Sequence, residues 1–126
     1  MKKITITGHT GFIGQNIINE LDEKKFNITG ISRTRLDDIN VNQIRKNIQN
    51  IKNSDIEKES TIIHLAGMTN VLECEKNPTE CFKINVGCTQ KILQIAKEKK
   101  CKVIFPSTSH VYGLPKKIPI DENQVV

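Results

Sequence analysis

Apolar and polar positions change their spacing repeatedly along the chain, from the alternation typical of strands to the three- and four-residue spacing typical of helices. Short apolar, β-branched segments predict strands over residues 3–7, 26–32, 60–66 and 102–105. Longer segments with helical spacing predict helices over residues 12–23, 41–51 and 77–99. The polar stretch 34–40 fits neither pattern and leaves room for a short additional strand.

The start of the last predicted helix carries a clear signal. Asn77 can cap the helix, Pro78 suits its first position, and Glu80 stands three residues after the cap. Strands that alternate with helices in this way form parallel sheets through right-handed crossovers. The nearly continuous apolar run 60–66 is typical of a strand buried on both faces. We therefore predict an open α/β sheet in one domain, residues 1–126.

The net charge of +5 changes this picture little. Basic residues are scattered, and their densest run, 97–102, is interrupted by Glu98. A nucleic-acid surface usually clusters its positive charge and interleaves aromatic side chains. We interpret the charges as solvated faces and expect no nucleic-acid partner.

Cysteines stand at positions 74, 81, 88 and 101, without the paired spacing of a zinc site. Cys81 and Cys88 fall on a similar side of one predicted helix, where cysteine behaves as a small apolar residue. The first residues enter a strand pattern directly, and no apolar run reaches the length of a membrane span. These features favour a reduced, cytoplasmic protein with no metal and no membrane partner.

A glycine-rich turn, Gly8-x-x-Gly11-x-x-Gly14, joins the first predicted strand to the first helix. Glycines permit a tight turn and let the backbone approach a diphosphate, while the N–H groups at the helix start favour an anion. The spacing differs from the common G-x-G-x-x-G fingerprint, and no Gly-Lys-Ser/Thr follows as in a P-loop. The position directly after the first strand favours dinucleotide binding.

Ser32 and Arg33 end the second predicted strand, where dinucleotide-binding sheets contact the adenosine ribose. An acidic residue there would bind the 2′-hydroxyl of NAD, whereas an arginine can bind the 2′-phosphate of NADP. A small hydroxyl residue followed by arginine favours NADP over NAD. The alternative interpretation is that Arg33 and Arg35 are ordinary solvated side chains.

Small and polar residues also follow the other predicted strands, at the edge where open α/β sheets bind ligands. The segment 64–67 is small enough for a cofactor to lie against its backbone, although His64 itself fits a packed strand-end residue better than a catalyst. Hydroxyl residues fill positions 107–109, and packing explains them poorly. Asn85 interrupts an apolar helix face, so its amide needs hydrogen-bond partners.

These motifs occur in one order: Thr7-Gly8-x-x-Gly11-Phe12-Ile13-Gly14, His64-Leu65-Ala66-Gly67, Asn85-Val86 and Ser107-Thr108-x-x-Val111-Tyr112-Gly113. Together they resemble the extended short-chain dehydrogenase/reductases, and more narrowly the NAD-dependent epimerase/dehydratase family that acts on sugar nucleotides. The resemblance covers nearly the whole chain. It implies a Rossmann-type, doubly wound parallel sheet, here incomplete, that binds NADP or NAD and supports hydride transfer to and from a nucleotide-linked sugar.

The resemblance implies contact with the cofactor at Gly8, Gly11, Phe12, Ile13, Gly14, Ser32, Arg33, Asp38, Ile39, Leu65, Ala66, Gly67, Thr69 and Asn85. Within this set, Asp38 and Ile39 resemble the pair that meets the adenine. Thr108 matches the family's catalytic hydroxyl residue, which hydrogen-bonds the reacting sugar oxygen. The sequence departs from the family at 87–89, where Gly-Cys-Thr replaces the usual x-Gly-Thr.

Tyr112 and Lys116 have the Tyr-x-x-x-Lys spacing, but they lie within the Val-Tyr-Gly loop and do not match the family's catalytic pair, and the sequence contains no other tyrosine. In the family that pair lies on the helix after the Val-Tyr-Gly loop, and its lysine lowers the pKa of the tyrosine. Residues 113–126 resemble the loop that leads to this helix. We therefore expect an N-terminal portion of an enzyme, lacking the catalytic helix and the C-terminal substrate domain.

The complete enzyme implied by the resemblance is an NAD(P)-dependent epimerase or reductase of a sugar nucleotide, and homo-oligomers are common in the family. Ser109-His110 stands where the dehydratases carry Asp-Glu, which argues against that branch. The alternative is a non-catalytic dinucleotide-binding module or sensor that associates with a partner chain. A flavodoxin-like domain fits less well, because no FMN-type phosphate loop is present.

Overall fold

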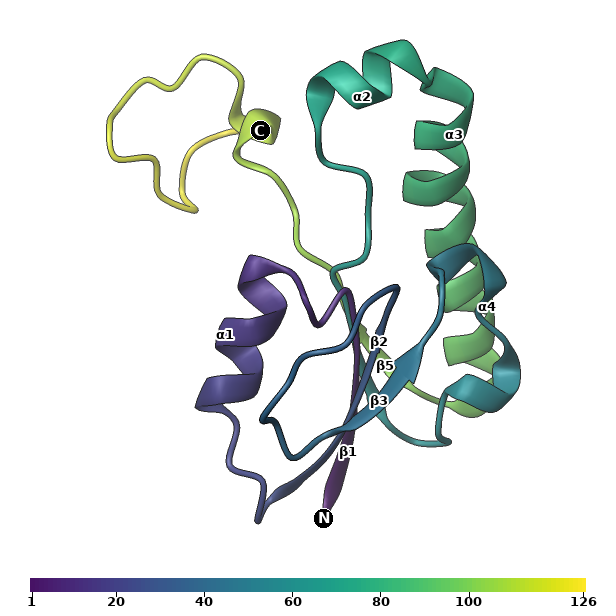
Figure 1. Ribbon diagram of the computed structural model, residues 1–126. Helices are drawn as coiled ribbons and strands as arrows, with labels where there is room; N and C mark the ends of the chain where they lie inside the picture. Colours follow the sequence, from purple (N-terminus) through teal and green to yellow (C-terminus); the bar gives the residue numbers. More distant parts are fainter.

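The computed structural model describes residues 1–126, which form one five-stranded parallel sheet in the order β3-β2-β1-β4-β5 (Figure 1). The strands are β1 (Lys2–Thr7), β2 (Phe26–Ser32), β3 (Asn42–Arg45), β4 (Thr61–His64) and β5 (Lys102–Ile104). The chain moves outward from β1 to β3 and then returns to β4 on the other side of β1. The strand order therefore reverses between β1 and β4, which is where open α/β sheets bind their ligands.

Helices cover both faces of the sheet, as in a doubly wound fold (Figure 1). Helix α1 (Phe12–Glu20) lies on one face, over a core of Ile4, Ile6, Ile18 and Ile28. Helix α4 (Cys88–Lys99) lies on the other face, over a larger core that includes Ile31, Ile62 and Ile92. The predicted Rossmann-type α/β fold is confirmed.

The helix predicted over 41–51 is wrong. The segment instead forms strand β3, followed by 3-10 turns at Ile48–Asn50 and Asn53–Asp55. Val41 packs into the core beneath α1, whereas Ile44, Ile48 and Ile51 pack into the core beneath α4. The apolar residues thus serve both faces of the sheet, although their spacing resembles one helical face. Residues 34–40 form no strand. The additional strand lies after them, as β3 from Asn42.

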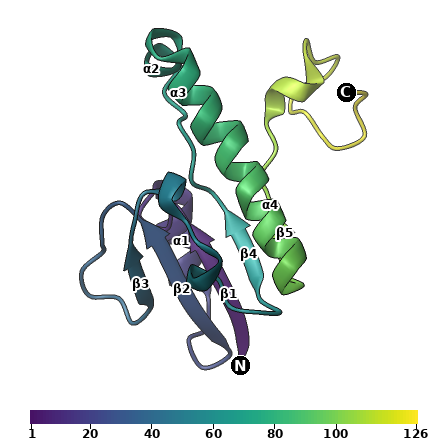
Figure 2. The same cartoon turned by 90° about the vertical axis from the view of Figure 1, so that its right-hand side faces the viewer.

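The helix predicted over 77–99 is present as one continuous helical segment, made of α3 (Pro78–Phe82), a π-helical turn (Lys83–Gly87) and α4. Pro78 occupies its first position as predicted, but the Asn77 side chain makes no capping hydrogen bond. A further helix, α2 (Val71–Lys76), was not predicted; the Asn70 side chain caps it by accepting from the Glu73 N–H at 3.0 Å. Figure 2 shows α2 and α3 extending beyond the carboxyl ends of the strands.

Cys74 of α2 and Cys81 of α3 form a disulfide, so the prediction of a reduced protein is wrong for this pair. The chain turns back between the two helices and brings the two Cα atoms within 5.2 Å. Cys88 is free and packs into the core beneath α4, in keeping with its predicted apolar role, and Cys101 is also free.

Beyond β5 the chain leaves the sheet and forms turns, including the 3-10 turn Ser109–Tyr112 (Figure 1). Most of its side chains from Phe105 to Val126 are exposed. No helix in the structure combines the length and apolar character that a membrane crossing requires.

Candidate functional site

The glycine turn between β1 and α1 leaves no room for a side chain at Gly8 or Gly14 and little room at Gly11. Gly8 has a φ of 76°, and a Cβ on it would lie 2.8 Å from the backbone nitrogen of Ala66. A Cβ on Gly11 would lie 3.3 Å from the Gly8 oxygen, and a Cβ on Gly14 would lie 2.6 Å from that oxygen. The turn is anchored at its start, where the Gly8 N–H donates to the Ile31 carbonyl of β2 at 2.8 Å.

Helix α1 begins beside this turn without a side chain to cap it. Its first N–H groups have no acceptor within the helix, and they combine with the helix dipole to favour an anion. The first turn of α1 carries no acidic residue that would oppose such a ligand. Phe12 and Ile13 expose their apolar side chains at the same place, at 85% and 54%. Diphosphate binding at this turn stays a prediction, and the tight turn and the uncapped start of α1 are the features that favour it.

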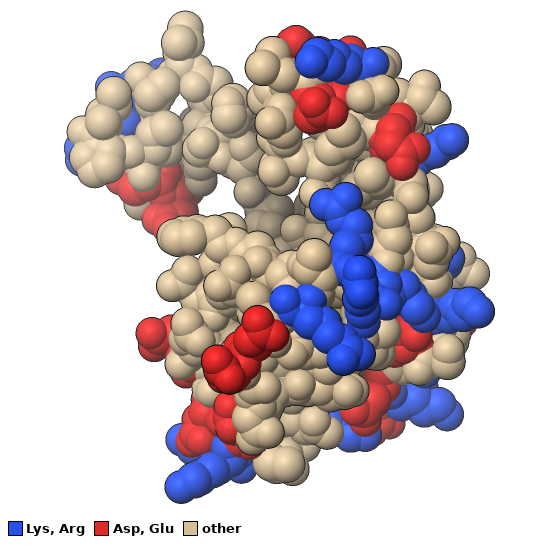
Figure 3. Space-filling model, viewed as in Figure 1, with Lys and Arg blue, Asp and Glu red and all other residues tan.

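The end of β2 lies against the glycine turn. The buried Ser32 accepts a hydrogen bond from the Thr10 N–H through its Oγ at 3.4 Å, and Thr34 Oγ1 donates to Thr10 Oγ1 at 3.1 Å. The side chain of Arg33 is exposed next to this contact, while the Arg33 carbonyl accepts from Arg45 Nε at 3.1 Å. Figure 3 shows basic side chains gathered over the ends of β2 and β3. Arg33, directly after β2, and Arg45, the last residue of β3, are thus neighbours at the carboxyl edge of the sheet.

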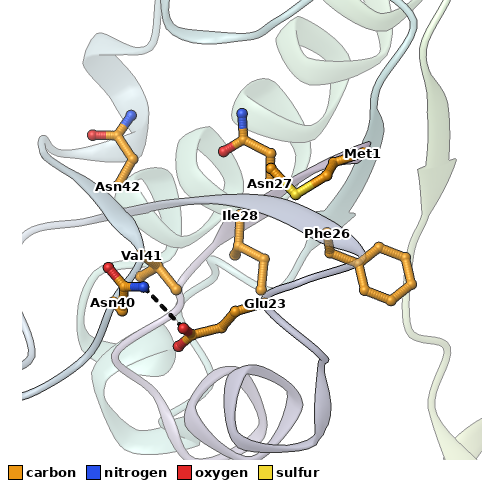
Figure 4. A pocket seen from close by; sticks show the side chains of 8 residues that line it. All are labelled: Met1, Glu23, Phe26, Asn27, Ile28, Asn40, Val41 and Asn42. Carbon is orange, nitrogen blue, oxygen red and sulfur yellow. Dashed lines mark hydrogen bonds between the residues drawn. The ribbon is translucent and has the colours of Figure 1, made fainter.

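Asp38 and Ile39 do not join this group. They lie in the loop before β3, where Asp38 is exposed with a φ of 54° and Ile39 packs against the core beneath α1. The next residue, Asn40, donates to Glu23 at 2.9 Å beside a hollow at the amino-terminal ends of the strands (Figure 4). The residues that follow the carboxyl end of β3 are instead Lys46, Asn47 and Ile48. Sequence reasoning missed them because it placed a helix over this segment.

A buried chain of hydrogen bonds connects β1, β4 and the long helix at the point where the strand order reverses. His64 Nδ1 lies 2.7 Å from Thr7 Oγ1, and His64 Nε2 lies 3.1 Å from Thr89 Oγ1. Thr89 Oγ1 donates to the Asn85 carbonyl at 2.7 Å, so it accepts from a protonated His64 Nε2. Thr7 Oγ1 also accepts from the Ala66 N–H at 3.2 Å. His64 is 1% exposed, which confirms its interpretation as a packed residue.

Asn85 holds the loop that follows β4. Its Oδ1 accepts from the Met68 N–H at 2.7 Å, and its Nδ2 donates to the Met68 carbonyl at 2.9 Å. The predicted need of this amide for partners is therefore confirmed. Asn85 lies in the π-helical turn, a kind of distortion that often occurs at functional sites. The amide fixes the backbone from Leu65 to Met68 next to Gly8, and the exposed Gly67 and Thr69 remain accessible on this loop.

Thr108 lies outside this arrangement. It precedes the 3-10 turn Ser109–Tyr112, and its Oγ1 accepts from the His110 N–H at 3.2 Å and lies 3.0 Å from His110 Nδ1. These contacts are local to an exposed turn. The structure thus brings together the predicted residues of the glycine turn, of the end of β2 and of the loop after β4, and leaves Thr108 apart from them.

Acidification is expected to destabilise the fold through His64. Burial lowers the pKa of His64 from its ordinary value of 6.5. The unfolded chain therefore takes up a proton at a higher pH than the folded chain does, and stability falls as the pH drops below about 6.5. Urea unfolding at about pH 7.5 and about pH 5.5 measures this loss. His64→Gln should reduce the change in the free energy of unfolding between the two pH values, whereas the control His110→Gln should retain it. An equal change in both variants would contradict the attribution to His64.

The parallel sheet, its glycine turn and the strand reversal beside it define a Rossmann-type fold with a nucleotide-binding edge. The model of the NAD dependent epimerase/dehydratase family matches residues 4–125, and the chain belongs to this family. A UDP-glucose 4-epimerase of Pisum sativum is 28% identical over 97% of this chain, and a putative UDP-glucose 4-epimerase of Methanocaldococcus jannaschii is 30% identical over 98%. The chain spans 41% and 44% of the lengths of these two relatives.

Solved structures show the same fold. MoeE5 in complex with UDP-glucose and NAD is 25% identical, with a TM-score of 0.83 over 98% of this chain and 42% of that one. The Bifidobacterium longum UDP-glucose 4-epimerase, in complex with NAD⁺ and UDP, superimposes with a TM-score of 0.81 at 24% identity. The likeness thus extends across the whole described chain and less than half of each neighbour.

Proposed function

We propose that this chain is the cofactor-binding portion of an NAD(P)-dependent epimerase or reductase that acts on a sugar nucleotide. The observation that carries the proposal is the glycine turn, because a side chain at Gly8, Gly11 or Gly14 would meet backbone atoms within 3.3 Å. The turn therefore presents bare backbone N–H groups at the start of α1, which suits a diphosphate. Family membership and relatives named as UDP-glucose 4-epimerases support the substrate class.

The residues present fit a dinucleotide along the carboxyl edge of the sheet. In this arrangement the turn binds the diphosphate, Ser32 and Arg33 face the adenosine ribose, and the segment 65–69 lines the opposite half of the cofactor. Asn85 holds that segment through both polar groups of Met68. The bound nicotinamide would supply or accept hydride. Asn47 and Ile48 come after Lys46 at the carboxyl end of β3, whereas Asp38 and Ile39 precede this strand, so we expect Asn47 and Ile48 to be better placed to contact the adenine.

The family uses a Tyr-x-x-x-Lys pair on a helix to exchange a proton while the cofactor exchanges hydride. The one such spacing in residues 1–126, Tyr112 to Lys116, lies at the end of the 3-10 turn and in the loop after it, and not on a helix. We therefore expect these residues alone to bind cofactor without normal turnover of a sugar nucleotide. Thr108, on its exposed turn, would orient a sugar oxygen in a complete enzyme. Robust oxidation of a sugar nucleotide by the isolated chain would overturn this expectation. Cofactor binding by a chain that never engages sugar nucleotides would favour the alternative of a binding module or sensor.

Calorimetry is expected to show tighter binding of NADP than of NAD, because Arg33 can pair with the 2′-phosphate. Arg33→Ala should weaken NADP binding about tenfold, as expected for the loss of one charge-assisted hydrogen bond, and should change NAD binding by less than about twofold. Lys24→Ala, an exposed cation before β2 at the amino end of the sheet, serves as the matched control. Equal or tighter binding of NAD by the unmodified protein would contradict the role of Arg33.

A further inference from the structure

The Gln43 side chain of β3 clamps the loop that follows β2. Its Nε2 donates to the Leu36 carbonyl at 2.9 Å, and its Oε1 accepts from the Leu36 N–H at 2.8 Å. Both polar groups of one backbone residue are thereby bound by one amide, as in a rung of a sheet. These two bonds also determine the orientation of the amide, since only this orientation satisfies both.

His9 joins this clamp from the glycine turn. The ring of His9 is fully buried, and its Nε2 lies 3.0 Å from Gln43 Oε1. Because that oxygen is an acceptor, His9 carries its proton on Nε2, and its Nδ1 is left without a partner. The ring occupies the space over Gly30 of β2, where a Cβ would overlap it. A buried ring nitrogen without a hydrogen-bond partner is destabilising. Hydrogen bonding alone therefore does not explain why His9 is buried here.

The segment between the two anchors carries the arginines. At its start, Ser32 and Thr34 are hydrogen-bonded to Thr10 of the glycine turn, and at its end Leu36 is held by Gln43. Arg35 Nη2 additionally donates to the Gln43 carbonyl at 3.5 Å. The segment 33–35 therefore has both ends fixed to elements that contact the diphosphate turn, although its arginine side chains are exposed.

We propose that Gln43, together with His9, is a positioning residue for recognition of the phosphorylated adenosine ribose. Gln43 touches no part of the ligand in this scheme. It keeps the backbone of 33–36 in one conformation before binding, so that the arginines meet a 2′-phosphate without first ordering the loop. We expect the diphosphate subsite to depend less on Gln43, because Gly8 and Gly11 donate backbone hydrogen bonds to Ile31 and Gly8 in addition to the contact of His9 with Gln43. The inference rests on the proposed binding of NAD(P).

The test compares two ligands that differ only in the 2′-phosphate, namely ADP-ribose and 2′-phospho-ADP-ribose. Gln43→Met keeps the length of the side chain. In calorimetry it should weaken the binding of 2′-phospho-ADP-ribose about tenfold and the binding of ADP-ribose less than about twofold. Gln94→Met is the matched control, because Gln94 lies on the exposed side of α4 and donates only to Glu98; it should change neither affinity.

Three outcomes overturn the inference, and they separate it from the proposed function. If Gln43→Met weakens both ligands equally, Gln43 has only a general structural role. If it weakens neither ligand, Gln43 has no part in binding. In both cases the unmodified protein still binds, and the proposed function stands. If the unmodified protein binds neither ligand, the proposed function fails and the inference fails with it.

A measurement on the unmodified protein keeps the inference testable where the variant does not fold. Amide hydrogen exchange at Leu36 should be as slow in the free protein as exchange in β3, because Gln43 already binds this N–H. It should slow further with 2′-phospho-ADP-ribose and less with ADP-ribose. Exchange at Leu36 as fast as in an unstructured loop would show that the segment is not ordered in advance and would overturn the proposal.

Discussion

Gly14→Ala should destabilise the protein and abolish binding of NAD(P). The new Cβ would lie 2.6 Å from both the Gly8 oxygen and the His9 Cα, and 2.7 Å from the His9 oxygen. All three are backbone atoms, so no side-chain rotation relieves the overlap and the turn must move away from α1. We expect Gly14→Ala to lower the free energy of unfolding by at least about 1–3 kcal/mol. The displaced turn would no longer present its N–H groups to a diphosphate.

Gly87→Ala is the matched control for this prediction. Gly87 lies in the π-helical turn, and a Cβ there meets no atom within 4 Å. Replacing a helical glycine by alanine in open space stabilises a protein by up to about 1 kcal/mol. Urea unfolding and calorimetry with NAD and NADP on both variants give the comparison. The two substitutions should change stability in opposite directions, and a stable Gly14→Ala protein that binds cofactor normally would contradict diphosphate binding at the glycine turn.

The strands were predictable because their cause is local. In β1, Ile4 and Ile6 face the core beneath α1 and alternate with Thr5 and Thr7. All four residues are buried, so the sequence shows this strand by its alternation and β-branched residues and not by its burial. The failure at 41–51 has the opposite origin. Ile44 lies in a strand and Ile48 in a 3-10 turn, and only the packing of the whole domain brings both into the core beneath α4. Spacing alone cannot distinguish this arrangement from a helix.

Some parts of the candidate site are also visible in local sequence, and others are not. The glycine spacing directly after a strand predicted the turn. A polar residue on an apolar helix face predicted that Asn85 needs hydrogen-bond partners. The contacts of Gln43 with His9 and Leu36 join three segments, and no local pattern announces them. The prediction of adenine contacts at Asp38 and Ile39 did not take strand β3 into account, because these residues lie in the loop before that strand. The roles of all the predicted site residues in binding stay predictions.

Helix α2 and its disulfide to α3 were missed for a related reason. The segment 71–76 spans less than two turns, too short to show helical periodicity, and its start is marked only by the capping Asn70. Without that helix, nothing in the spacing of Cys74 and Cys81 indicated that the two residues lie side by side. The reversal of the chain between α2 and α3 makes them neighbours.

Ile92→Ala should cost about 2–5 kcal/mol in the free energy of unfolding, the range for truncating a fully buried isoleucine. Ile92 is 0% exposed and packs in the core that joins α4 to the sheet. The same helical segment carries Asn85 and Thr89, so loosening its contact with the sheet should also weaken the hold on the Met68 loop. Since domains are stable by only about 5–15 kcal/mol, this one substitution removes a large share.

Leu93→Ala provides the control on the same helix. Leu93 is the next residue along α4 and is 50% exposed, so its truncation removes little buried surface. Alanine is also the most favourable helical residue, which offsets part of the loss, and we expect a change below about 1 kcal/mol. Urea unfolding of both variants gives the two free energies. Similar losses of stability in both variants would mean that α4 does not pack on the sheet through Ile92. A different contact would then have to hold the helical segment that carries Asn85.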